Sequence, residues 1–87
     1  MKLSDEQIAR YISYGFDTIP EMVAFAFGIP LTNKRTKEWD YETYHEFYRT
    51  ERDTYKRLRK MQKWGEAEQT GRKVIGNTTA VTWRMIA

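Results

Sequence analysis

The sequence predicts an α+β fold, mainly α, in which three to four helices are followed by a C-terminal β-hairpin. Apolar residues recur at helical spacing through much of the chain, and residues 78–86 alternate between two sets as in a strand. The length of 87 residues, with 40% hydrophobic and 15% aromatic residues, is enough for one small core. We therefore expect a single folded domain over residues 1–87.

The first helix is predicted over about residues 5–14. Ser4 and Gln7 have the spacing of a capping box, in which each side chain binds the backbone N–H of the other residue. The apolar face begins at Ile8, and Gly15 ends the helix.

The second helix is predicted over about residues 18–27. Either Asp17 or Thr18 can cap its N-terminus. Residues 22–27 are apolar nearly all round the helix, so we expect it to be largely buried, and Gly28 to end it.

Segment 28–48 is predicted to hold an inserted loop and a short aromatic helix. Residues 31–38 are polar and basic without a clear period, whereas aromatic side chains at helical spacing follow Asp40. We expect these aromatic residues to pack in the core or at a dimer interface; they are Tyr41, Tyr44, Phe47 and Tyr48. A break is predicted near Arg49, because Thr50 can cap a new helix. The alternative is one continuous helix, since the same aromatic stripe extends past this point.

A basic amphipathic helix is predicted over about residues 50–64. Its apolar residues Tyr55, Leu58 and Met61 lie on one face, and cations spaced three or four apart lie on another. Residues 49–73 hold nine Lys or Arg against four acids. Such asymmetry favours an anionic partner, and the alternative is a face that only keeps the protein in solution.

The C-terminal hairpin is predicted over about residues 66–86. Glu66 to Thr70 would form a short first strand, with turns over residues 71–73 and 76–77. The alternation from Thr78 to Ile86 predicts a half-buried second strand. We also expect Trp64 and Trp83 to pack where the basic helix meets the hairpin.

The pattern Tyr55-x-x-Leu58-x-x-Met61-x-x-x-Gly65, the basic loop 71–77 and the closing strand 80–85 together resemble winged helix-turn-helix DNA-binding domains. In that family the third helix enters the major groove and the wing contacts the DNA backbone or the minor groove. Two features depart from the family pattern. Some twenty residues, Gly28 to Tyr48, separate the second and third helices, and acids stand directly after Gly65.

The resemblance implies sequence-specific binding of double-stranded DNA, and transcription regulation as the role. On the recognition helix, Arg49, Arg52 and Lys56 would approach base edges, and Arg59, Lys60 and Lys63 would meet phosphates. Arg72 and Lys73 are expected at the wing tip. One alternative is a winged-helix module for protein–protein contact or a subunit of a larger assembly. RNA binding on the aromatic segment is a third option.

Other functional classes find little support in the residues. The chain has no cysteine, which excludes disulfides and thiolate zinc sites. His45 between Glu42 and Glu46 fits a solvated helix face better than a metal site, and we expect no metal, no cofactor, no small-molecule substrate and no catalysis. The apolar run 22–27 is far too short to span a membrane, and no signal peptide is indicated. We expect a cytoplasmic protein, nucleoid-associated if its source is prokaryotic or viral.

Overall fold

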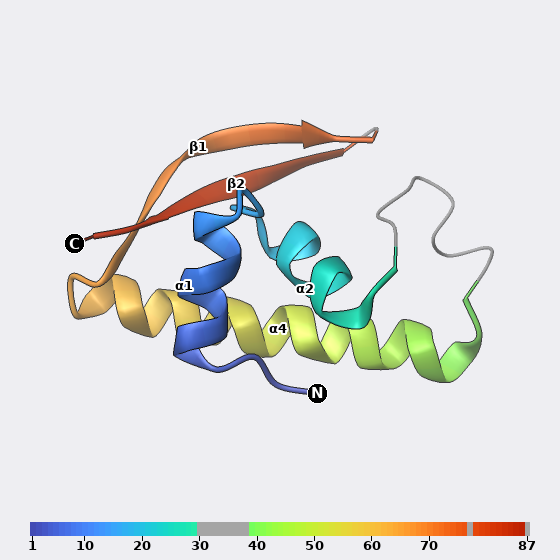
Figure 1. The fold of residues 1–87 in the computed structure, drawn as a ribbon. Coiled ribbons are helices and arrows are strands. Elements are labelled where there is room, and N and C mark those ends of the chain that lie inside the picture. Colours follow the sequence, from blue (N-terminus) through green and yellow to red (C-terminus); the bar gives the residue numbers. More distant parts are fainter. Residues whose placement is uncertain (30–38, 77, 87) are drawn as a thin grey trace.

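The computed structural model describes residues 1–29, 39–76 and 78–86. Its elements are α1 (Asp5–Ser13), α2 (Ile19–Phe27), α4 (Tyr41–Lys63), β1 (Ala67–Ile75) and β2 (Thr78–Met85). The two strands form an antiparallel hairpin at the C-terminal end of the chain (Figure 1). The predicted α+β class, mainly helical with a C-terminal hairpin, is confirmed.

The first two helices begin where their capping residues predict. At α1 the Ser4 hydroxyl accepts from the Gln7 amide at 3.1 Å, and the Gln7 side chain accepts from the Ser4 amide at 2.9 Å. At α2 the cap is Thr18, not Asp17, and its hydroxyl accepts from the Glu21 amide at 3.4 Å. Both capping arrangements satisfy amides that have no partner inside the helix.

The predicted break near Arg49 is wrong, because α4 is one continuous helix of 23 residues. Asp40 caps it, accepting from the Thr43 amide at 2.7 Å. Thr50 lies in the middle of the helix and is fully buried, and its hydroxyl donates to the Glu46 carbonyl at 2.8 Å. A threonine that bonds to the preceding turn no longer competes for a cap position. The aromatic and basic segments therefore belong to a single helix.

The inward face of α4 explains this continuity. Its buried residues follow each other at steps of three or four, and we call them the buried stripe: Phe47, Thr50, Thr54, Leu58 and Met61. The stripe crosses the expected break without interruption. Both threonines satisfy their hydroxyls on the helix backbone, so they can lie in the core at little cost.

The hairpin lies where it is predicted, but its first strand is longer than expected, and of the two predicted turns only the one at residues 76–77 remains. β1 continues past Gly71 to Ile75, so Arg72 and Lys73 lie within the strand opposite Val81 and Ala80. The glycine stands beside a register shift between Gln69 and Gly71, which is a bulge and not a chain reversal. The predicted turn over residues 71–73 is therefore wrong. The connection lies at residues 76–77, and Asn77 is outside the described residues.

The helices and the hairpin share one core. In Figure 1, α4 runs along one side of the molecule, the hairpin lies on the other, and α1 and α2 stand between them. The segment joining α1 to α2 also pairs with the hairpin, since Thr18 bridges Thr82 and the Asp17 carbonyl accepts from the Trp83 amide at 2.8 Å. Buried apolar residues come from every element: Leu3, Ile8, Met22, Val23, Ala24, Phe47, Leu58, Met61, Ala67 and Trp83.

The two tryptophans at the junction of helix and hairpin have opposite environments. Trp83 is 2% exposed, which confirms the prediction, whereas Trp64 is 68% exposed, so the prediction for it is wrong. The buried stripe ends at Met61, so Trp64 lies beyond the part of α4 that faces the core. Directly after it the chain turns towards β1 at Gly65, which has a φ of 75°. Among the helices of the described ranges, none combines the length and the apolar content that a membrane span needs.

Candidate nucleic-acid interface

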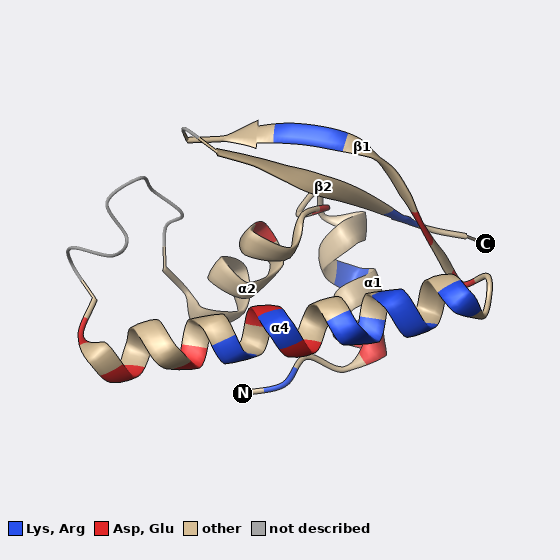
Figure 2. Cartoon of the chain, turned by 180° about the vertical axis from the view of Figure 1, so that it is seen from behind, with Lys and Arg blue, Asp and Glu red and all other residues tan. Residues whose placement is uncertain are grey.

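Six cations form one exposed surface on α4. We call this surface the cationic face, and its members are Arg49, Arg52, Lys56, Arg59, Lys60 and Lys63. At 3.6 residues per turn they cover about 100° of the helix circumference, roughly opposite the buried stripe. Figure 2 shows Lys and Arg positions recurring along the C-terminal two thirds of the helix. The structure therefore brings together all six helix residues that the sequence predicts.

Most of these charges are not neutralised by the protein itself. Five of the six cations make no hydrogen bond or ion pair with another residue that the structure describes. The exception is Arg59, whose Nη1 donates to the Tyr55 hydroxyl at 2.9 Å. Its guanidinium carbon also lies 5.8 Å from the centroid of the Tyr55 ring. Exposed cations without internal partners are free to bind an external anion.

Charge is unevenly distributed along α4. Residues 41–48 include two acids, Glu42 and Glu46, and no Lys or Arg, whereas residues 49–63 hold seven Lys or Arg against two acids. Acids near a helix N-terminus and cations near its C-terminus are favourable for the helix dipole. The arrangement thus stabilises α4 and concentrates positive potential at one end (Figure 2).

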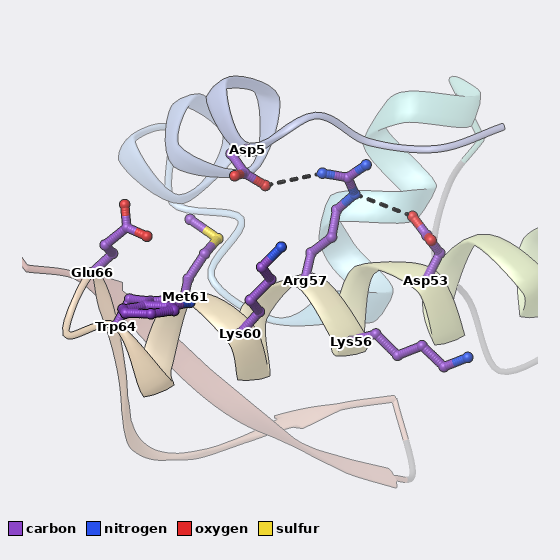
Figure 3. A pocket seen from close by; sticks show the side chains of 8 residues that line it. All are labelled: Asp5, Asp53, Lys56, Arg57, Lys60, Met61, Trp64 and Glu66. Atoms are coloured by element: carbon purple, nitrogen blue, oxygen red, sulfur yellow. Dashed lines mark hydrogen bonds and ion pairs between the residues drawn. The ribbon is translucent and has the colours of Figure 1, made fainter.

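Arg57 is a seventh cation on this helix, but it serves the fold. Figure 3 shows its guanidinium between Asp5 of α1 and Asp53, at 3.2 Å and 3.4 Å respectively. These contacts tie the start of α1 to the middle of α4 beside a pocket of about 300 Å³. Arg57 was not predicted as a structural residue, although its spacing of four from Asp53 is a usable signal.

Lys73 is not a wing-tip residue, which corrects the prediction. Its ammonium lies 2.8 Å from the Glu21 carboxylate and 3.0 Å from that of Asp17. The hydrogen bond to Glu21, which has the larger effect, and the hydrogen bond to Asp17 raise the pKa of Lys73 above its ordinary value of 10.5. Because both acids belong to the start of α2 and the segment before it, Lys73 holds the hairpin against the helices.

Arg72 is placed differently, although it is the next residue along the strand. It is exposed, and it makes no ion pair with any of the described residues. Successive residues of a strand point to opposite faces of the sheet, so Arg72 and Lys73 do not share a surface. Arg72 is therefore the cation of the predicted wing pair that stays available to a ligand.

The aromatic residues of α4 divide between core and surface. Phe47 is fully buried, and its ring packs 5.4 Å from that of Phe27. Tyr41 is 76% exposed, with its ring 4.1 Å from the His45 imidazole. Tyr44 and Tyr48 pack on each other at 4.6 Å, and the Tyr44 hydroxyl donates to that of Tyr48 at 3.2 Å. The core position is confirmed for Phe47, whereas the dimer interface expected as the alternative for this set stays a prediction.

Trp64 lies beside the cationic face and not in the core, where it was predicted. Trp64 follows Lys63 directly and exposes most of its indole, and in Figure 3 it borders the same pocket as Lys56 and Lys60. A signal was present, because Trp64 lies one turn beyond Lys60 and off the phase of the buried stripe. Within the described ranges, no group of three or more His, Cys, Asp or Glu is placed to hold a metal ion.

Comparisons with models of protein families, with curated proteins and with solved structures found no match to this chain. The proposed function therefore rests on the geometry of the chain itself.

Proposed function

We propose that this protein is a small winged helix-turn-helix protein that binds double-stranded DNA through the cationic face of α4 and acts in transcription regulation. The observation that carries the proposal is the set of exposed cations without internal partners on one side of a continuous helix. The order of helices followed by a hairpin is compatible with this class of domain.

The dimensions of α4 suit a DNA groove. From Arg49 to Lys63 the helix is about 21 Å long, at 1.5 Å per residue. A helix with its side chains is about 10–12 Å wide, close to the width of about 12 Å of the major groove. Because α4 runs along one side of the molecule in Figure 1, its outer face can approach a duplex without the other helices intervening.

The cations have different expected roles. Arg49 and Arg52 carry guanidinium groups, which can bind guanine through two parallel hydrogen bonds worth roughly 1–3 kcal/mol of discrimination. Lys56 lies near them on the helix and can also approach base edges. Arg59, Lys60 and Lys63 lie further along α4 and would meet phosphates, which set affinity more than sequence preference. Arg72 of β1 is the wing cation that would add a further phosphate contact.

A fluorescence-anisotropy titration of a random duplex tests the proposal. With about five phosphate contacts, the affinity should fall roughly 10³-fold between about 50 and 200 mM salt, because each neutralised phosphate releases counterions. Absence of duplex binding at about 50 mM salt would overturn the proposal. Competition with single-stranded RNA under the same conditions separates DNA from RNA binding.

Base reading by the helix is a separate test. We expect Arg52→Ala to reduce the difference in affinity between a selected site and a random duplex about tenfold, since it removes a guanine contact. Lys63→Ala should weaken both duplexes equally. Equal losses for Arg52→Ala as well would show that α4 binds the DNA backbone only.

A second candidate function, a protein–protein interaction module, is favoured by exposed aromatic side chains at the C-cap of α1 and on α2. Tyr14 is 58% exposed and Phe25 is 45% exposed, and Phe25 stacks on Phe16 at a ring distance of 4.6 Å. These rings also suit self-association, which would place two copies of α4 on DNA half-sites about one helical turn apart. Sedimentation equilibrium tests this self-association, and a monomer at high protein concentration would exclude the dimer hypothesis.

A further inference from the structure

A groove of about 320 Å³ lies between α4 and the hairpin. Most of the side chains that line it are apolar: Ile19, Pro20, Tyr55, Ala80, Val81 and Trp83. Small-molecule sites in proteins have volumes of about 300–1,000 Å³ and mostly apolar walls with a few polar groups. The volume of this groove therefore suits a compact molecule with one or two rings.

Arg59 is the one cation among the residues that line the groove. Its contact with the Tyr55 hydroxyl at 2.9 Å holds the guanidinium beside the aromatic ring. No carboxylate within the described ranges pairs with Arg59, so most of its five N–H donors remain unused. A planar guanidinium of this kind is shaped to bind a carboxylate through two parallel hydrogen bonds.

Trp83 also lines this groove, and its indole N–H is buried without a hydrogen-bond acceptor among the residues that the structure describes. The residue is 2% exposed. The Arg59 guanidinium, the side-chain amide of Gln69 and mostly apolar walls thus define the chemistry of this groove.

We propose that the groove binds a small planar aromatic carboxylate, with its ring against Tyr55 and the aliphatic walls and its carboxylate on Arg59. The regulatory consequence rests on the proposed function, because Arg59 also belongs to the cationic face. A ligand that draws the Arg59 guanidinium into the groove withdraws it from DNA. Ligand and DNA then weaken each other's binding by the same factor.

The binding step is tested on the free protein by NMR, with benzoate as the probe. The expected result is a saturable shift of the Trp83 indole N–H resonance, lost in Arg59→Gln and kept in Lys63→Gln. Benzamide, which has the same ring without the charge, should bind at least tenfold more weakly. A shift that does not saturate, or an equal loss in both variants, would overturn the site.

The regulatory step is tested on duplex DNA. Saturating benzoate should weaken duplex binding severalfold relative to sodium chloride at equal ionic strength, and the duplex affinity of Arg59→Gln should not respond to it. Saturable benzoate binding with unchanged duplex affinity would overturn the coupling. If no duplex binding occurs at all, the proposed function fails, while the NMR titration still decides whether the groove binds carboxylates.

Discussion

At the scale of single residues, the two adjacent cations of β1 serve different purposes. Lys73 is held by Glu21 and Asp17, whereas Arg72 is exposed and makes no ion pair with the described residues. Their neighbouring positions and equal charges give no hint of this difference. It arises because alternate residues of a strand face opposite sides, and acids stand on only one of them.

Lys73→Gln should therefore lower stability, and Arg72→Gln should lower DNA affinity. We expect Lys73→Gln to cost about 0.5–1 kcal/mol of unfolding free energy, since partly exposed ion pairs contribute little. Arg72→Gln should leave stability unchanged. It should reduce the slope of the logarithm of duplex affinity against that of salt by about one, which corresponds to one phosphate contact. Thermal unfolding and anisotropy titrations of both variants measure these effects, and the reverse pattern would contradict the assignment.

The contribution of Lys73 should depend on pH in a defined direction. Its folded-state pKa is raised, so the stability it provides is fully present below its ordinary pKa of 10.5. That stability is lost as the pH rises through the higher folded-state value. The difference in melting temperature between the native protein and Lys73→Gln should be constant from about pH 7 to 9 and shrink in more alkaline solution.

At the scale of elements, the continuity of α4 decides how the cationic face is built. One straight helix holds Arg49 and Arg52 in the same frame as Lys60 and Lys63, whereas a break would have let the two halves point apart. Local sequence signals favoured a break, because Thr50 and Asp53 have the chemistry of a helix start. Burial of the Thr50 side chain against the carbonyls of Met1 and Glu46 prevails over that local preference.

A comparison of Glu51→Gly with Glu51→Ala tests the continuity. In the interior of a helix glycine is about 1 kcal/mol less favourable than alanine, while at a break the two are nearly equal. We expect Glu51→Gly to unfold at lower urea concentration than Glu51→Ala by an amount that corresponds to about 1 kcal/mol. The alanine variant controls for loss of the Glu51 side chain, and equal midpoints would indicate a break.

The N-terminal cap of α4 should make the aromatic half of the helix sensitive to acid. The Thr43 backbone N–H and, with a smaller effect, the Thr43 side chain donate hydrogen bonds to the Asp40 carboxylate. They lower the pKa of Asp40 below 3.8. The stabilisation it provides is present above its ordinary pKa and is lost as the pH falls through the lower folded-state value. The protection factors of the amides at residues 43–46 should therefore fall in acid, with a smaller response in Asp40→Asn, which keeps a capping acceptor without the titration.

At the scale of the whole molecule, the position of charge matters more than the net charge. The formal net charge is only +3, yet the cationic face concentrates six cations on one side of α4. Binding to a polyanion responds to the cations at the contact, since each one releases a counterion from the nucleic acid.

Two double variants with equal net charge separate these effects. Lys60→Gln with Lys63→Gln should lower the slope of the logarithm of duplex affinity against that of salt by about two, because two phosphate contacts are lost. Lys2→Gln with Arg10→Gln removes the same charge outside the cationic face and should leave the slope unchanged. A similar slope for both double variants would mean that DNA binding does not use this face.

The sequence by itself determined the elements that local chemistry controls. The capping box of α1, the hairpin position and the membership of the cationic face follow from spacing and residue type within a few turns of chain. Only the tertiary structure decided the continuity of α4, the exposure of Trp64 and the role of Lys73. Each of these depends on a partner distant in the sequence, or on where the core ends, and short-range patterns contain neither.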